Sequence, residues 1–152
     1  MRIGLIADTH GLLRPEALAA LRGSERILHA GDIGDPTILD TLATIAPVDA
    51  IRGNNDTADW ARDLPDTRRL RLGDIALYML HDLKELPQRP PDAPVDVIVA
   101  GHSHRPLVEP RDGVLVVNPG SAGRRRFRLP ISVARLDIDG RRVQATIVEL
   151  DI

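Results

Sequence analysis

Seven side chains that can bind metal ions stand just after short apolar runs of the sequence. They are Asp8, His10, Asp32, Asn54, His81, His102 and His104. Imidazole nitrogens combined with carboxylate oxygens suit Mn, Fe, Co, Ni or Zn better than Ca. Seven ligands are more than one catalytic ion needs and about right for two. A pair of divalent ions stabilises the attacking and the leaving oxygen of an in-line displacement, and we expect Asp32 to bridge the pair.

The composition restricts any metal site to nitrogen and oxygen ligands. The chain of 152 residues has no cysteine, which excludes disulfides, thiol catalysis and zinc–thiolate sites. Aromatic residues make up 2% of the chain and the net charge is −2, so the composition speaks against a nucleic-acid-binding surface. A hydrophobic fraction of 43% predicts a packed core, and the length predicts one domain spanning residues 1–152.

Apolar runs and helix signals alternate through the first third of the chain. Strands are predicted at Ile3–Ala7, 27–30 and 48–51, and each ends at one of the polar clusters. Pro15 suits the first turn of a helix, and Asp35 followed by proline reads as an N-cap. Strands alternating with helices predict a parallel sheet. Ligand sites in such sheets lie beyond the carboxyl ends of the strands, where these polar clusters fall.

The remainder of the chain is predicted to be richer in strands. The expected elements are two extended runs within 68–80 around Gly73-Asp74, a buried strand at Val95–Ala100, and hairpins turning at Asp112-Gly113 and Asp139-Gly140. Four prolines between Pro87 and Pro94 predict a loop. One domain with an α/β half and a β-rich half most simply forms two sheets face to face, with helices outside.

Each polar cluster alone also fits an ordinary turn or loop cap. Gly53 to Asp56, for example, contains the residue types that turns favour. The occurrence of all the clusters in order, each after a strand, favours a shared site. His29 precedes Asp32 on the second strand, and we interpret it as a buried, hydrogen-bonded histidine that supports the site.

The clusters form an ordered series of motifs that is similar to a known family. The series is Asp8-x-His10, Gly31-Asp32, Gly53-Asn54-x-Asp56, His81 and Gly101-His102-x-His104. It resembles the motif series of calcineurin-like metallophosphoesterases, from Met1 to about Leu136. The compact length and Asn118-Pro119-Gly120-Ser121, a turn expected to shape the site, further resemble the small YfcE-type phosphodiesterases. The resemblance implies an α/β fold, a four-layer αββα sandwich of two mixed β-sheets flanked by helices.

The resemblance also implies a role for each ligand. Asp8, His10 and His104 would hold one ion, Asn54, His81 and His102 the other, and Asp32 would bridge them. Hydroxide bound to this dinuclear centre would then attack phosphorus. Mn is the metal that we expect, with Ni, Fe, Co or Zn as alternatives. The catalytic residues implied are Asp32, Asn54, Asn55 and Asp56.

Two positions depart from the family pattern. Asn55 stands where the family usually has a histidine that contacts the phosphate or protonates the leaving group. Asparagine can donate a hydrogen bond to a phosphoryl oxygen but has no acidic proton to give, so we expect Asn55 to bind substrate. Asp82 follows His81 where many relatives have glycine, and it either orients His81 or is a solvated turn residue.

A dense run of arginines follows the turn at Asn118. It comprises Arg124, Arg125, Arg126 and Arg128. Guanidinium groups match phosphate geometry, so Arg126 and Arg128 are expected to bind substrate. At least two of the four are expected to lie in a solvated loop.

The sequence thus predicts a metal-dependent phosphoesterase, most simply a phosphodiesterase, that hydrolyses a small-molecule phosphate ester. A non-catalytic scaffold of the same fold and a nuclease are the alternatives. The complete ligand set speaks against the scaffold, and the near-neutral charge speaks against the nuclease. The first apolar run stops at Asp8, too early for a signal peptide, and we expect a cytoplasmic protein without membrane contact. The resemblance also implies a homo-oligomer, most simply a dimer.

Overall fold

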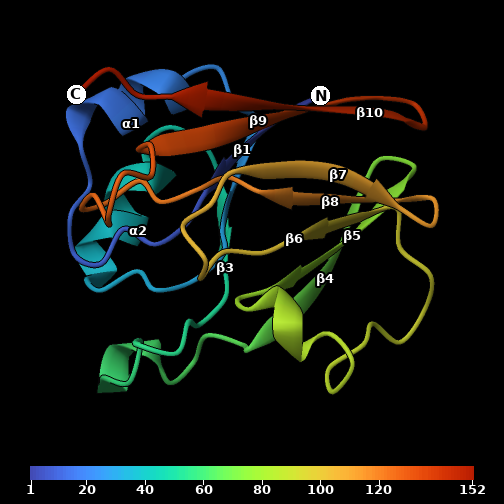
Figure 1. Cartoon of the computed structure of the whole chain (residues 1–152), viewed down its shortest axis with the longest axis horizontal. Coiled ribbons are helices and arrows are strands. Elements are labelled where there is room, and N and C mark those ends of the chain that lie inside the picture. The colour runs from blue at the N-terminus through green and yellow to red at the C-terminus, as the bar shows by residue number, and fades with distance from the viewer.

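Two five-stranded sheets packed face to face form the centre of the computed structural model, which describes residues 1–152 (Figure 1). Sheet A has the strand order β10-β9-β1-β2-β3, and sheet B has the order β4-β5-β6-β8-β7. The strands of sheet A are β1 (Arg2–Ile6), β2 (Arg26–His29), β3 (Val48–Ala50), β9 (Ser132–Asp139) and β10 (Arg142–Glu149). Those of sheet B are β4 (Thr67–Leu72), β5 (Ile75–Leu80), β6 (Val97–Val99), β7 (Leu107–Arg111) and β8 (Val114–Asn118).

Both sheets combine three strands that pair in parallel with two that pair in the antiparallel sense. In sheet A, β1, β2 and β3 run parallel, while β9 pairs with β1 in the antiparallel sense. In sheet B, β5, β6 and β8 run parallel, and β4 and β7 are antiparallel edges. The predicted strands and both predicted hairpins are therefore confirmed. The carboxyl ends of β1, β2, β3, β5 and β6 carry the polar clusters.

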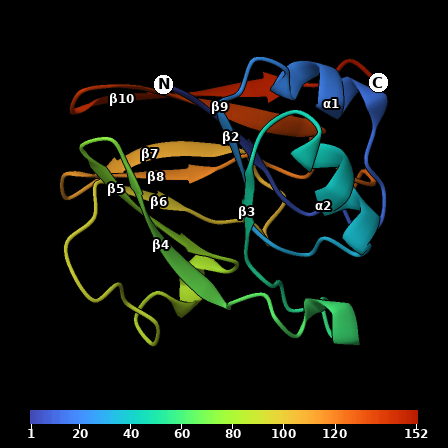
Figure 2. The ribbon, with the colours of Figure 1, turned by 180° about the vertical axis from the view of Figure 1, so that it is seen from behind.

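The helices α1 (Pro15–Leu21) and α2 (Pro36–Ala43) cover the outer face of sheet A (Figure 2). Leu21, Ile38 and Leu42 are buried there against the apolar side chains of β1 and β2. The carboxylate of Asp35 accepts the N–H of Thr37 at 2.9 Å, which confirms the predicted N-cap.

The outer face of sheet B has a much thinner cover. The 3-10 helix η2 (Leu83–Glu85) and the loop after it lie there, with Leu83 and Leu86 packed against Tyr78 and Ile98. The prolines of this loop prevent a longer helix, because proline lacks the N–H that a helix requires. A second 3-10 helix, η1 (Asp59–Ala61), lies between β3 and β4. The fold is thus the expected α/β sandwich of two mixed sheets, with its second outer layer reduced to one short turn and a loop.

The main apolar core lies between the two sheets. Leu5 and Leu28 of sheet A meet Leu77, Val99 and Val117 of sheet B, and all five are fully buried. Aliphatic side chains that alternate along each strand place one face in this core. The core holds the two sheets in a fixed relation, and so it fixes the strand ends that carry the polar clusters. Neither α-helix is long and apolar enough to cross a membrane.

Candidate metal centre

The seven predicted ligands come together where the two sheets meet. Asp8 and His10 follow β1, Asp32 follows β2, and Asn54 follows β3; His81 follows β5, while His102 and His104 follow β6. Sheet A therefore contributes four of these side chains and sheet B three. The strands that precede them run parallel within each sheet, so their ends lie at one edge of the sandwich, as the topology predicts.

Asp8, His10 and His104 form a first group, whose ligand atoms lie within 4.8 Å of one another. The Nε2 atoms of both histidines are 3.7 Å from Oδ1 of Asp8, and they are 3.4 Å from each other. Two ring nitrogens and one carboxylate oxygen thus face a common point. These are the atoms through which histidine and aspartate bind transition metals.

Asp32, His81 and His102 form a second group with ligand atoms within 4.8 Å of one another. Nε2 of His81 lies 3.1 Å from Oδ2 of Asp32, and Oδ1 of Asn54 lies 3.1 Å from Nδ1 of His102. Oδ2 of Asp32 is also 3.7 Å from Nε2 of His10, so the carboxylate of Asp32 lies between the two groups.

Two buried ligand atoms have no hydrogen-bond partner, and both face the centre. The Nδ1 atom of His81 lies 2.7 Å from the carbonyl oxygen of Ala30. A carbonyl oxygen can only accept, so Nδ1 carries a proton and Nε2 is the ring atom that takes up either a second proton or a metal ion. Nε2 lies 3.1 Å from Oδ2 of Asp32 and 3.8 Å from Oδ1 of Asp8, and neither Nε2 nor Oδ1 of Asp8 is hydrogen-bonded. Lone pairs that face each other in this way repel unless a proton or a metal cation lies between them, so the residues present fit a bound metal.

The pKa values reflect the same concentration of ligands. Burial raises the pKa of Asp8 to about 7. Burial alone would lower the pKa of His81, but the adjacent carboxylate of Asp32 and the carbonyl of Ala30 raise it to about 9. Burial lowers the pKa of His104 to about 4, with a further contribution from the charge of Arg126. A high histidine pKa beside an acid means that the site favours positive charge, which either a proton or a metal supplies.

The backbone at the centre is held in an uncommon conformation. Five non-glycine residues there have positive φ, namely Asp8, His10, Asp32, His102 and His104, at 46° to 71°. Such a conformation costs on the order of 1–3 kcal/mol per residue and persists only where the surroundings impose it. The strands β1, β2 and β6 are thus each followed by a sharp turn that carries polar side chains of the centre.

Hydrogen bonds tie the loops of the centre to one another. The carboxylate of Asp56 is buried and accepts N–H groups of Ile33, Gly34 and Gly53 at 2.9–3.1 Å, so it joins the loops after β2 and β3. Gly53 must be glycine, because a Cβ atom would stand 2.1 Å from Oδ1 of Asp32. Asp56 therefore lies behind the site, with its oxygens directed at the backbone.

Residues outside the ligand set fix the loop after β1. The N–H of Gly31 donates to Nδ1 of His29 at 3.1 Å, so Nε2–H of the neutral ring donates to the hydroxyl of Thr9 at 3.0 Å. This agrees with the expected supporting role of His29. The hydroxyl of Ser121 donates to the carbonyl of Asp8 at 3.1 Å, and the amide of Asn118 donates to the carbonyl of Gly101 at 3.0 Å. The turn at Asn118 thus shapes the site backbone, as expected.

The residues expected to bind substrate lie at different distances from the centre. Asn55 donates to Asp32 from its backbone N–H at 2.8 Å and from its side-chain amide at 3.2 Å. Arg126 is exposed, and its positive charge opposes the rise in the pKa of Asp8 and adds to the fall in the pKa of His104. Arg128 instead lines a separate hollow with Arg105 and Phe127.

The carboxylate of Asp82 does not hydrogen-bond to His81, and Asp82 is more than a solvated turn residue. One oxygen of its carboxylate caps η2 by accepting the N–H of Lys84 at 3.1 Å. The other lies 3.7 Å from Nε2 of His102, whereas His81 is bound to Ala30 instead. Asp82 therefore adjoins the second group through His102.

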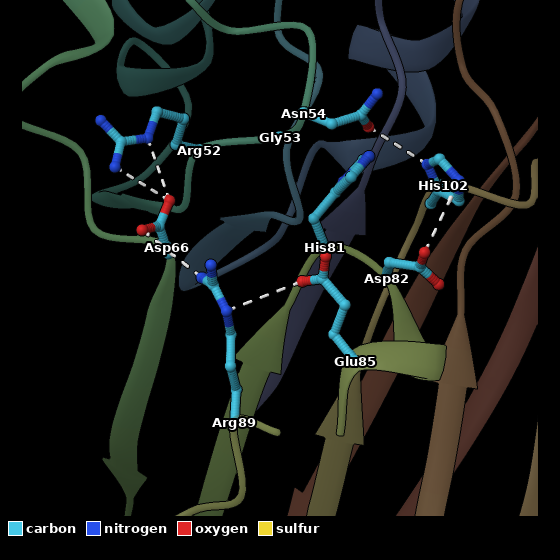
Figure 3. A pocket seen from close by; sticks show the side chains of 9 residues that line it. All are labelled: Arg52, Gly53, Asn54, Asp66, His81, Asp82, Glu85, Arg89 and His102. Carbon is cyan, nitrogen blue, oxygen red and sulfur yellow. Dashed lines mark hydrogen bonds and ion pairs between the residues drawn. The ribbon is translucent and has the colours of Figure 1, made fainter. Parts of the chain in front are cut away.

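A polar pocket beside the second group was missed from the sequence. Arg52, Asp66, Glu85 and Arg89 line it together with Asn54 and the two histidines of the second group (Figure 3). Arg52 directly precedes the Gly53-Asn54 motif, and this is the only feature of the sequence that could have indicated the pocket. Asp66 comes from a second segment and Glu85 and Arg89 from a third, both without a motif, and only the folded chain brings the three segments together.

Comparison with known proteins identifies a family for most of the chain. Residues 1–141 match the calcineurin-like phosphoesterase superfamily domain. A probable metallophosphoesterase of Methanothermobacter thermautotrophicus is 35% identical over 97% of this chain and 92% of its own length. The phosphodiesterase YfcE of Escherichia coli is 28% identical over 91% of this chain and 89% of its own. Among solved structures, the zinc complex of wild-type Vps29 from Entamoeba histolytica has the same fold, with a TM-score of 0.78 at 21% identity over 99% of this chain and 100% of that one. The chain belongs to the calcineurin-like phosphoesterase superfamily, among relatives of the small YfcE type.

Proposed function

We propose that this protein is a phosphodiesterase that hydrolyses a small phosphate ester at a centre of two divalent metal ions. Asp8, His10 and His104 would hold one ion, and Asn54, His81 and His102 the other, with Asp32 shared between them. The observation that carries the proposal is the pair of buried, unpartnered ligand atoms, Oδ1 of Asp8 and Nε2 of His81, which face the same point. Mn is the metal that we propose, since imidazole and carboxylate ligands suit it.

Bound metals would activate water and neutralise charge on the phosphoryl oxygens. The protein would position the substrate around them. Asn55 holds Asp32 through two hydrogen bonds, which orients the shared carboxylate. The amide of Asn55 and the exposed guanidinium of Arg126 are the groups that we assign to phosphate binding. For Arg128, which lies in the hollow beside Phe127, contact with a part of the substrate away from the phosphorus is the role that we assign.

Asp56 would act by positioning rather than by contact with substrate. Its carboxylate is saturated by backbone N–H groups and holds the loops that carry Asp32 and Asn54. It would maintain the distance between these two ligands when metal binds.

The test of this function is a metal count combined with an activity assay. Protein purified without chelator should contain two transition metals per chain and should hydrolyse bis(p-nitrophenyl) phosphate with added Mn. Asp32→Ala should abolish hydrolysis and lower the metal content, because it removes a ligand from both ions. Asp92→Ala, which changes an exposed loop carboxylate, is the matched control and should behave as wild type. Asp32→Ala protein with two metals and normal turnover would refute the shared-ligand assignment.

The same measurements separate the alternatives. A non-catalytic scaffold predicts no bound metal and no rescue of hydrolysis by added metal. A nuclease predicts binding to DNA that weakens steeply with salt. The net charge of −2 and the aromatic content of 2% give the nuclease no supporting feature.

A further inference from the structure

The pocket beside the second metal group is built from ion pairs (Figure 3). Nε and Nη2 of Arg52 donate to one oxygen of Asp66 at 3.0 and 2.9 Å. Nη1 of Arg89 lies 3.4 Å from the other oxygen of Asp66, and its Nε lies 3.8 Å from Glu85. The N–H of Arg52 also donates to the carbonyl of Pro65 at 2.8 Å, which fixes the two segments side by side. The four side chains therefore form one connected chain of charges along the pocket wall.

The pocket opens directly onto the proposed catalytic centre. Asn54, His81 and His102 line it as well as belonging to the second group. A group esterified to a phosphate held at the metals would therefore extend into this pocket. Its volume is about 200 Å³, below the roughly 300–1,000 Å³ of pockets that enclose drug-sized ligands. The pocket suits a small substituent.

The chemistry of the lining excludes an apolar substituent. None of its residues is hydrophobic. An aryl or acyl group would cover these charged and amide groups without returning the hydrogen bonds that they lose, and unpaired polar groups are costly. An apolar group would thus gain little there.

The charges of the lining also favour neither a second anion nor a cation. Two arginines and the three carboxylates of Asp66, Glu85 and Asp82 line the pocket, so its charges nearly cancel and attract neither a further phosphate nor an ammonium group strongly. Asp66 is already paired with both guanidinium groups, which leaves it unavailable to an ammonium group. Neutral hydroxyl groups suit such a lining, since they accept from guanidinium N–H groups and donate to carboxylates.

We infer that this pocket binds the alcohol part of the substrate and selects a small neutral polyol, such as a glyceryl or monosaccharide group. The inference rests on the proposed function for the location of the phosphate. Arg52 and Arg89 are then specificity-determining residues that read the hydroxyl groups, with Asp66 holding both in place.

A binding experiment tests the inference without requiring turnover. The probes are glycerol 3-phosphate and n-propyl phosphate, which differ only in hydroxyl groups, titrated calorimetrically into Mn-loaded protein. A site built to hydrogen-bond hydroxyl groups discriminates against an analogue that lacks them. We expect glycerol 3-phosphate to bind about tenfold more tightly, a modest factor for a pocket that is open to solvent. Phenyl phosphate and O-phosphoethanolamine test the aryl and cationic alternatives, and tighter binding of either one would overturn the inference.

Variants connect the discrimination to the pocket. Arg89→Met and Arg52→Met keep an unbranched, flexible side chain but remove the donors, and each should abolish the preference while metal content is unchanged. Arg2→Met is the matched control, because Arg2 is exposed to a similar extent and ion-paired to Asp137, but lies at the opposite end of β1. It should retain the tenfold preference. Equal binding of the two probes by wild type, or an undiminished preference in both pocket variants, would refute the inference.

A kinetic experiment distinguishes failure of the polyol-pocket inference from failure of the proposed phosphodiesterase function. Mixed diesters of p-nitrophenol with glycerol or n-propanol share one leaving group, so the pocket should affect KM far more than kcat. Hydrolysis of both esters with equal KM contradicts the polyol pocket and leaves the phosphodiesterase intact. Hydrolysis of neither contradicts the phosphodiesterase, and the titrations still decide the pocket.

Discussion

At the scale of single residues, the hydrogen bond on one side of a ring or carboxylate decides what its other side can do. Nδ1–H of His81 donates to the carbonyl oxygen of Ala30, which leaves Nε2 to bind a proton or a metal cation. The backbone N–H of His102 donates to Oδ2 of Asp8 at 3.0 Å, which leaves Oδ1 without a hydrogen bond. Residues whose hydrogen-bond partners determine their chemical role are therefore good targets for mutation. Asn55, bound to Asp32, and His29, bound to Thr9 and Gly31, are two such residues.

Asn55 lacks a titrating proton, which predicts a specific pattern of substrate reactivity. Turnover should be good for aryl phosphodiesters and poor for alkyl ones, because a positioned general acid contributes about 10²–10⁴-fold and none is available at this position. Asn55→His should help alkyl substrates more than aryl ones, with Asp32 as the hydrogen-bond partner that orients the new ring. The measurement is kcat/KM across a series of leaving groups at fixed Mn.

Asn55→Ala is the control for this series, since it removes the amide without adding an acid and should keep the steep dependence on leaving-group pKa. If the wild-type series is flat while chemistry limits the rate, another group supplies the proton and this role of Asn55 is wrong.

Burial of His29 predicts a dependence of stability on pH. Burial lowers the pKa of His29 from 6.5 to about 3. The unfolded chain therefore takes up a proton below about pH 6.5 that the native ring refuses, and stability falls as pH decreases through this window. The loss reaches about 1.4 kcal/mol per pH unit, and it is absent above pH 6.5, where both states are neutral.

The measurement is the free energy of unfolding of metal-free protein in urea at about pH 7, 6 and 5. His29→Gln offers an acceptor and a donor without a titrating group, so its curve should fall less steeply than that of wild type. Parallel curves for the two proteins would show that His29 is protonated in the native state.

At the scale of elements, local pattern predicted most of the framework. Apolar runs that end in aspartate, asparagine or glycine indicated the inner strands, and the turn residues at Asp112 and Asp139 indicated both hairpins. Pairing partners were not predictable in this way, because periodicity shows which face of a strand is buried but not which strand lies beside it. The pairing of β1 with β9 thus appeared only in the structure.

The candidate site shows the same division between local and long-range information. The motifs indicated the residues that the structure brings together at the candidate centre, since each motif belongs to one short segment. The pocket beside it joins Arg52, Asp66 and Arg89 from three segments, and no local pattern records their proximity. The left-handed backbone of His10 and His104 was also unpredictable, because bulky residues rarely adopt it and tertiary contacts impose it here.

Asp56 hydrogen-bonds to the loops after both β2 and β3, so its substitution should lower stability and metal affinity together. Asp56→Asn keeps the shape of the side chain but turns an NH₂ group toward backbone N–H donors. We expect a loss of about 2–3 kcal/mol in the free energy of unfolding, as for a buried hydrogen bond to a charged group. Mn affinity should fall as well, because Asp32 and Asn54 lie on the two loops.

Urea unfolding and Mn titration of the same variant measure both effects. Asp92→Asn makes the same chemical change on an exposed loop and should alter neither quantity. Loss of stability without any change in Mn affinity would show that the loops hold the ligands without Asp56.

At the scale of the whole molecule, the candidate centre joins two sheets that also meet through the apolar core and through the ion pair of Arg68 with Asp49. Asp8, Asp32 and Asn54 belong to sheet A, whereas His81 and His102 belong to sheet B. Ions bound at the proposed centre would link the two sheets in addition to the core. Metal binding would therefore be coupled to the stability of the sandwich.

This coupling predicts that metal removal lowers the melting temperature. Ligand present at about 100 times its Kd stabilises the native state by about 2.7 kcal/mol. For a chain of this size, that corresponds to a decrease in Tm of roughly 5–10 °C when chelator replaces Mn. Calorimetry with Mn and with chelator gives the difference, which should be much smaller for Asp32→Ala. An unchanged Tm for protein shown to lose two ions would contradict a centre shared by both sheets.

The position of β1 at the middle of sheet A sets the order in which a nascent chain can fold. Arg2 of β1 pairs with Asp137 of β9, 135 residues further along the chain. On the ribosome, β1 and β2 emerge early, yet one side of β1 has no partner until β9 has been synthesised. Unpaired strand edges in such intermediates invite association with other chains. Synthesis of β9 is thus the step that closes the sheet, and a chain stalled before it presents its own central strand to the translation machinery and its chaperones.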